Sequence, residues 1–126
     1  VGDFVGKALA GRDIIINGDG SPIRSFMDLG DAVHWLMMIL EHGDAGDDFN
    51  VGSSQAITIY ELAQMVRDLV NPDIRIRIKK GSNVSSGNPA NYFYVPDTSK
   101  IRDKLGVKQL MTLSESINNY AQFLSD

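Results

Sequence analysis

Apolar residues recur along this chain at two spacings, and the two spacings together predict a mixed α/β fold. Helical spacing, with apolar residues three and four positions apart, predicts four or five helices, at residues 1–10, 31–41, 59–70, 98–105 and 113–124. Short apolar or alternating runs predict strands at 14–16, 23–27, 49–51, 74–78 and 92–95. The pattern therefore indicates one small α/β domain over residues 1–126, long enough to bury a core.

Several helix ends carry residues that typically cap helices. Thr58-Ile-Tyr-Glu61 and Thr112-Leu-Ser-Glu115 are capping boxes, in which the threonine hydroxyl and the glutamate satisfy each other's free backbone donors. Asp31 and Asp97 are expected to cap the helices that follow them, and Gly106 is expected to end the fourth helix. The helix boundaries therefore rest on local chemistry as well as on spacing.

The helix predicted over residues 31–41 is apolar on nearly every side. One stripe lies at helical spacing, and further apolar residues fill much of the opposite side. A helix of this kind is buried on more than one side, so we expect one of its surfaces to meet another domain. The stripe consists of Val33, Leu36, Met37 and Leu40, and the opposite side of Trp35, Met38 and Ile39.

Composition excludes several classes of function. A net charge of −4 disfavours a nucleic-acid or anionic-membrane surface, and the absence of cysteine excludes disulfides and thiolate metal sites. The longest unbroken apolar run, Trp35–Leu40, is far too short to span a membrane, and no secretory signal is visible near Val1, so we expect a cytoplasmic protein. Because the chain starts inside a predicted helix and without methionine, we expect it to be a piece of a longer polypeptide.

The segment from Gly18 to Asp31 is the main candidate for chemistry. A glycine-rich turn leads onto a short apolar strand that carries Arg24, and a helix begins shortly afterwards. The planar guanidinium can bind two phosphate oxygens at once. An arginine that simply lies on the surface or between strands is the alternative interpretation.

Two other sites are excluded by their spacing. The segment Asn17–Ser21 begins like a calcium loop, but Pro22 and Asp28 stand where the loop needs glycine and glutamate. Gly18-Asp-Gly20 is followed by Arg24 and not by a third glycine that opens a helix, so it is no dinucleotide fingerprint.

Three segments in this order resemble the extended short-chain dehydrogenase/reductase family, the NAD-dependent sugar-nucleotide epimerases and dehydratases. The first is Gly18–Asp31, with its Gly-x-Gly-x-x-x-Arg-Ser-Phe pattern before an aspartate. The second is Phe49–Ala63, in which Phe-Asn-Val-Gly-Ser precedes Thr-Ile-Tyr-Glu-Leu-Ala. The third is Asp97-Thr-Ser-Lys100 followed by Leu105-Gly106. The resemblance covers nearly the whole chain and implies a small mixed α/β substrate-binding domain, normally appended to a Rossmann domain that these residues do not include.

The resemblance also implies roles for particular residues. Arg24 would contact the diphosphate of a sugar nucleotide, and Asn50 would line the substrate pocket, with a turn-stabilising role as the alternative for Asn50. Asn88-Pro89, in a Ser/Asn/Gly-rich stretch predicted to be a loop, stands where many members have Arg-Pro, and Lys79 or Lys80 is a candidate to replace that cation. Asp28 departs from the family pattern and would repel phosphate unless its side chain turns away to bond backbone.

The implied function is substrate recognition within a longer enzyme. NAD would be held by the upstream Rossmann domain of the same polypeptide, the substrate would be a nucleotide-diphosphate sugar, and the full-length enzyme could be a homodimer. None of the tyrosines here is followed four residues later by lysine, so the family's catalytic Tyr-x-x-x-Lys pair is absent and this part alone is expected not to catalyse. The alternatives are a non-catalytic nucleotide-sugar-binding or regulatory relative, and an independent interaction module that pairs through the surface of Trp35, Met37, Met38 and Ile39.

Overall fold

Short strands and longer helices alternate through residues 1–79 and 92–126, which the computed structural model describes. The predicted mixed α/β class is confirmed. In chain order the elements are α1 (Gly2–Leu9), β1 (Ile14–Asn17), β2 (Ile23–Arg24), α2 (Leu29–His42), β3 (Ile57–Thr58), α3 (Ile59–Val70), β4 (Ile76–Lys79), β5 (Phe93–Tyr94), α4 (Ser99–Leu105) and α5 (Leu113–Ser125).

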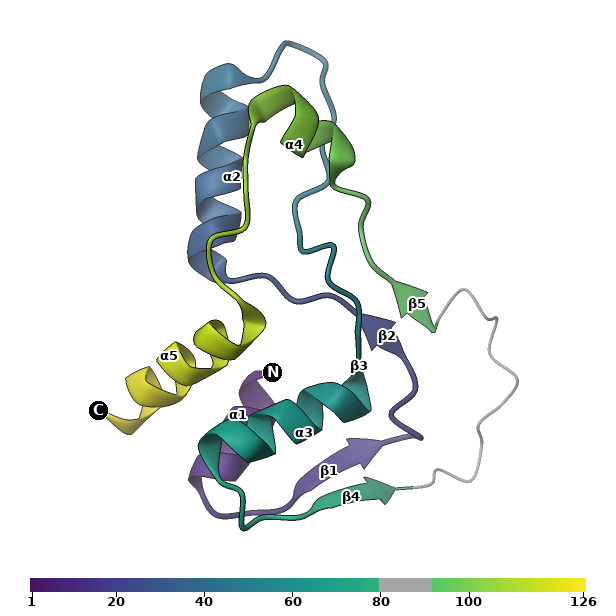
Figure 1. Cartoon of the computed structure of the whole chain (residues 1–126), viewed down its shortest axis with the longest axis vertical. Coiled ribbons are helices and arrows are strands. Elements are labelled where there is room, and N and C mark those ends of the chain that lie inside the picture. Colours follow the sequence, from purple (N-terminus) through teal and green to yellow (C-terminus); the bar gives the residue numbers. More distant parts are fainter. Residues whose placement is uncertain (80–91) are drawn as a thin grey trace.

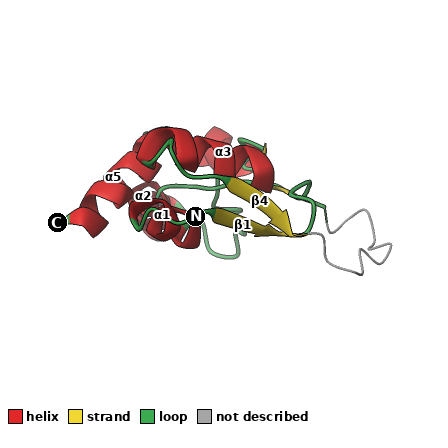
Figure 2. Ribbon diagram, turned by 90° about the horizontal axis from the view of Figure 1, so that it is seen from below, coloured by secondary structure: helices red, strands yellow, loops and turns green. Residues whose placement is uncertain are grey.

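The larger core lies where three helices meet a two-stranded sheet. Strands β1 and β4 pair in parallel, with Ile14 opposite Ile76, and α3 lies over this pair (Figure 2). Helices α1, α3 and α5 pack against one another beside it. The buried residues of this core, from both the helices and the strands, are Val5, Ala8, Ile14, Ile16, Leu62, Ala63, Val66, Ile74, Leu113 and Ile117.

A second, smaller core lies between α2 and α4, at the far end of the molecule from the β1–β4 pair (Figure 1). Its buried members are Trp35, Ile101 and Val107, and the indole Nε1 of Trp35 donates to the Lys108 carbonyl at 3.2 Å. Lys104 forms an ion pair with Asp44 at 2.8 Å, which ties α4 to the loop after α2.

A three-stranded sheet of order β3-β2-β5 lies between the two cores (Figure 1). Strand β2 pairs antiparallel with β3 and parallel with β5, so Arg24 lies beside Ile57 on one side and Tyr94 on the other. The chain therefore passes from one core to the other through the strand that carries Arg24.

The predicted helix ends are mostly confirmed. Both capping boxes form, at Thr58 and Glu61 and at Thr112 and Glu115. Gly106 ends α4 with a φ of 66°, a left-handed conformation that favours glycine. The N-cap position of α4 is Thr98, one residue after the predicted Asp97.

The predicted cap of α2 is wrong. Asp28 occupies the N-cap position, and its Oδ1 accepts a hydrogen bond from the Gly30 N–H at 2.8 Å. Asp31 lies inside the helix, only 4% exposed, and its carboxylate accepts from the N–H groups of Leu110 and Met111. Asp31 therefore joins α2 to the segment that leads into α5.

Two predicted strands also need correction. Strand β2 covers only two of the residues 23–27, because the chain turns after Arg24 toward the start of α2. Residues 49–51 form no strand, since they pair with no neighbouring strand among the described residues and Asn50 instead bonds through its side chain to Asp97. The predicted loop at 81–91 lies outside the described residues. Within residues 1–79 and 92–126, every helix is too short or too polar to cross a membrane.

Candidate functional site

A cavity of about 240 Å³ lies beside the central sheet and is the site most closely connected with the sequence motifs. Residues that follow β2 form one wall, the loop 50–53 forms the second, and residues of and after β5 form the third. The lining residues are Ser25, Met27, Asn50, Val51, Gly52, Ser53, Tyr94 and Pro96.

The loop wall is shaped by close packing at Gly52. A Cβ atom at this position would lie 2.8 Å from the Cγ of Pro96, which is closer than two carbon atoms that are not bonded to each other approach in proteins. The next residue, Ser53, is buried, and its Oγ accepts from the Gln55 N–H at 3.1 Å. A side chain at position 52 would therefore push against Pro96 on the opposite wall of the cavity.

Asn50 lies on this wall and also has a structural contact. Its side-chain Nδ2 donates to the Asp97 carbonyl at 2.9 Å and so joins the loop to the start of α4. The Asp97 carboxylate accepts from the hydroxyl and the N–H of Ser99, and these bonds hold the pKa of Asp97 below its usual value. This contact reaches a residue 47 positions away and not the turn around Asn50, so the binding role and the turn-stabilising alternative both stay predictions.

Arg24 does not share a wall with Asn50. The next residue, Ser25, follows β2 and lines the cavity, whereas Arg24 is not among the lining residues. Arg24 is half-buried, and its Nη1 donates to the Ile23 carbonyl at 2.8 Å. Arg24 thus lies at the end of the middle strand of the central sheet, one residue from the cavity wall.

The other predicted charges fall in different places. The Asp28 side chain turns to the backbone as the N-cap of α2, which is the arrangement expected to remove its repulsion of phosphate. Lys79 lies at the end of β4, in the sheet of the larger core. Asn88 and Lys80 lie outside the described residues.

The described wall residues suit hydrogen bonding better than acid–base chemistry. Ser25, Ser53 and Tyr94 bring hydroxyl groups and Asn50 brings an amide, and groups of both kinds pair with sugar hydroxyls. Among the lining residues only Tyr94 has an ionisable side chain. In the described part of the chain there is no group of three or more His, Asp or Glu residues placed to hold a metal.

The chain's own glycine turn does not fit NAD. A dinucleotide site needs a glycine turn that opens a helix, so that the pyrophosphate meets the helix N-terminus. Here the turn with Gly18 and Gly20 runs from β1 to β2, two strands. This turn therefore does not have the form of an NAD site.

Sequence reasoning missed the roles of Ser25, Ser53 and Tyr94 on this wall. No local signal marks Ser25, which lies just after the two-residue strand β2. The places of Ser53 and Tyr94 depend on how the loop 50–53 and β5 meet across the fold.

Comparisons with known proteins show which family the chain resembles. The model of the NAD-dependent epimerase/dehydratase family matches residues 1–52. UDP-glucuronic acid decarboxylase 6 of Arabidopsis thaliana is 31% identical over 93% of this chain. These matches make the chain similar to the NAD-dependent epimerase/dehydratase family. The dTDP-4-dehydro-6-deoxy-D-allose reductase of Streptomyces bikiniensis is likewise 35% identical over 79% of the chain.

The fold of the chain is also that of solved structures. UDP-glucose 4-epimerase of Thermotoga maritima, whose structure contains UDP-glucose, matches 98% of the chain with a TM-score of 0.85 at 23% identity. The match covers 38% of that epimerase. The chain likewise spans 32% of the decarboxylase and 30% of the reductase, about a third of the length of each.

Proposed function

We propose that this chain is the substrate-binding part of an NAD-dependent enzyme that modifies nucleotide-diphosphate sugars, as an epimerase or dehydratase does. Similarity to this family supports the reaction class, because the matched relatives are named as enzymes acting on UDP- and dTDP-linked sugars. The observation that carries the proposal is the cavity of hydroxyl and amide groups beside β2, with Arg24 one residue from its wall.

Arg24 binds the diphosphate in this proposal, and Asn50 lies against the sugar. A guanidinium can bind two phosphate oxygens in parallel, and the position of Arg24 beside the cavity wall leaves the hydroxyl-lined cavity for the uncharged sugar. Asn88, in the place of the arginine that many members have, contributes amide hydrogen bonds and no charge.

In this proposal, the NAD site and the catalytic residues of the enzyme lie outside this chain. A Rossmann domain of the same polypeptide holds NAD and supplies the Tyr-x-x-x-Lys pair, and this chain recognises substrate without itself catalysing the reaction. The glycine turn that runs between two strands and the shortage of ionisable groups on the described cavity wall support this division. The cytoplasm and a homodimeric assembly stay predictions.

Calorimetric titration with UDP and with uridine tests the role of Arg24. A charge-assisted hydrogen bond contributes about 1.5–3 kcal/mol, so Arg24→Ala is expected to weaken UDP binding roughly 10- to 150-fold. Uridine lacks the phosphates, and its affinity should not change. Arg12→Ala is the matched control, since Arg12 is exposed and lies away from the cavity.

Circular dichroism of both variants checks that half-buried Arg24 is not needed for folding. Equal UDP affinity in Arg24→Ala and Arg12→Ala would remove Arg24 from the site. Equal losses for UDP and uridine in a folded Arg24→Ala variant would also contradict a diphosphate contact.

A further inference from the structure

The loop 44–53, which follows α2, has two halves with different partners. Its second half, residues 50–53, lines the sugar cavity. Its first half carries three carboxylates, and each of them forms an ion pair with a lysine of α4. We call this set the charge clamp, and it consists of Asp44, Asp47, Asp48, Lys100 and Lys104.

Lys104 is the centre of the charge clamp. Its Nζ lies 2.8 Å from Oδ2 of Asp44 and also bonds to Oδ2 of Asp47, whose side chain is only 18% exposed. Hydrogen bonds to Asp44 and Asp47 raise the pKa of Lys104, and the bond from Lys104 lowers the pKa of Asp47. A single exposed ion pair contributes little to stability, but a lysine shared by two carboxylates forms a network that holds the loop against α4.

The contact between the loop and α4 continues as far as the cavity wall. Lys100, one turn earlier on α4, has its Nζ 2.8 Å from Oδ1 of Asp48 and 5.3 Å from the centre of the Phe49 ring. Asn50 then donates to the Asp97 carbonyl at 2.9 Å, just before α4 begins. The loop therefore runs antiparallel to α4 and is held at successive places, the last of which lies on the cavity wall (Figure 1).

The wall opposite Asn50 also leads into α4. Tyr94 and Pro96 line this wall, and α4 begins at Ser99. The two walls approach closely, since a Cβ atom at Gly52 would lie 2.8 Å from the Cγ of Pro96. A movement of the loop relative to α4 would therefore change the width of the sugar cavity.

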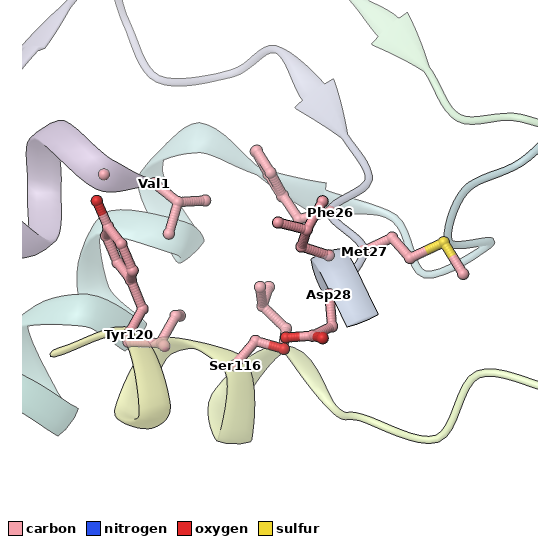
Figure 3. Close-up of a pocket in the computed structure, with 10 residues that line it drawn as sticks. Val1, Phe26, Met27, Asp28, Ser116 and Tyr120 are labelled. Carbon is pink, nitrogen blue, oxygen red and sulfur yellow. The ribbon is translucent and has the colours of Figure 1, made fainter. Parts of the chain in front are cut away.

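The smaller core supports a further part of the same cavity. Met27 and Val51 line the cavity, and both pack against this core. In Figure 3 the Met27 side chain accordingly points away from the apolar cavity at the start of α2. The sugar cavity thus lies directly against the core that joins α2 to α4.

Helix α2 contributes its inward face to this core. Trp35 is 2% exposed, and Met38 and Ile39 are half-buried. The interaction surface expected from Trp35, Met37, Met38 and Ile39 is therefore wrong as a set, because only Met37 is exposed. Because the core already joins α2 to α4, the charge clamp acts on the loop between α2 and the cavity wall.

We propose that the charge clamp positions the wall formed by residues 50–53 and thereby sets the affinity of the cavity for the sugar. Lys100 and Lys104 are positioning residues, since they do not line the cavity and act through the loop that does. The step from wall position to sugar affinity rests on the proposed function, whereas the hold of the charge clamp on the wall does not.

Amide hydrogen exchange in the full-length gene product tests this hold without any ligand. Lys104→Met keeps an unbranched side chain but removes the charge, and mass spectrometry should find severalfold faster exchange in peptides covering residues 50–53 and 94–97. Lys104→Arg keeps the charge and should restore slow exchange. Lys108→Met is the matched control, because Lys108 is exposed and lies outside the charge clamp. Equal exchange of these peptides in Lys104→Met and Lys108→Met would overturn the proposal.

Calorimetry of the same variants measures the effect on the sugar. UDP-glucose is titrated beside UDP, and dTDP-glucose beside dTDP, so that the ratio of the two affinities reports what the sugar adds. Lys104→Met should lower this ratio about 2- to 5-fold with the nucleoside diphosphate affinity unchanged, and Lys104→Arg should restore it. Equal losses for the nucleotide sugar and its nucleoside diphosphate would indicate a general structural role and overturn the proposal. Faster exchange of the wall in a protein that binds no nucleotide sugar would instead contradict only the proposed function.

Discussion

Asp31 offers the sharpest test of how the two cores are held together. Its carboxylate is 4% exposed and accepts from the Leu110 N–H at 3.0 and 3.1 Å and from the Met111 N–H at 2.9 Å. These bonds join α2 to the segment that enters α5. We predict that Asp31→Asn destabilises the domain while keeping its shape.

The size of the loss follows from the two backbone donors. An asparagine of the same shape keeps one oxygen but turns an NH₂ group toward the other donor, which is then buried without an acceptor. Losing one charge-assisted bond and weakening the other costs about 2–3 kcal/mol. For a chain of this size the loss corresponds to a fall in Tm of roughly 10 °C.

Urea unfolding followed by circular dichroism measures this loss. Asp103→Asn is the control, because Asp103 is exposed on α4 and its neutralisation should change the free energy of unfolding by less than about 0.5 kcal/mol. A loss for Asp31→Asn within about 0.5 kcal/mol of this control would refute the idea that Asp31 holds the two segments together.

Two further predictions concern the cavity and acid stability. Gly52→Ala should weaken nucleotide-sugar binding severalfold, because the added methyl group displaces Pro96 from the cavity wall. Calorimetry measures the affinity, and Gly6→Ala, at a position in open space on α1, is the control. Equal affinities in the two variants would contradict the packing argument. The N–H and hydroxyl of Thr58 lower the pKa of Glu61 in the folded protein. The ionised Glu61 carboxylate therefore stabilises the fold fully above its unfolded pKa of about 4.3, and this stabilisation is lost as the pH falls through the lower folded pKa. As the pH falls from about 6 to about 3, the urea midpoint should therefore fall less steeply in Glu61→Gln than in the control Glu41→Gln. If the midpoints of the two variants fall in parallel, the capping box is not the source of the acid sensitivity.

Local signals in the sequence were enough for the helices. The capping boxes at Thr58 and Thr112 and the glycine at 106 act within one turn of chain, so their patterns predicted the boundaries that form. Asp31 shows where local reasoning fails. An aspartate near a helix start resembles a cap, but its partners are the backbone of Leu110 and Met111, about 80 residues later.

The candidate site was predictable only in part. The motifs located Arg24 and Asn50, but the sequence could not tell that Ser25, which follows β2, lines the cavity and that Arg24 does not. Tyr94 enters the wall through the parallel pairing of β5 with β2, a contact between segments about 70 residues apart. Local sequence patterns do not predict which residues tertiary pairing brings together.

Hydride transfer in the full-length gene product is the most direct test of the proposed function. The protein would be incubated with NAD and a panel of UDP-, dTDP- and GDP-linked sugars, with the absorbance of reduced nicotinamide and the mass of the sugar followed together. We expect at least one nucleotide sugar to be converted or to reduce the bound cofactor, and Arg24→Ala to slow that reaction more than Arg12→Ala. Binding of nucleotide sugars without conversion of any would contradict the enzyme and favour a non-catalytic relative, and failure to bind any would contradict substrate recognition itself.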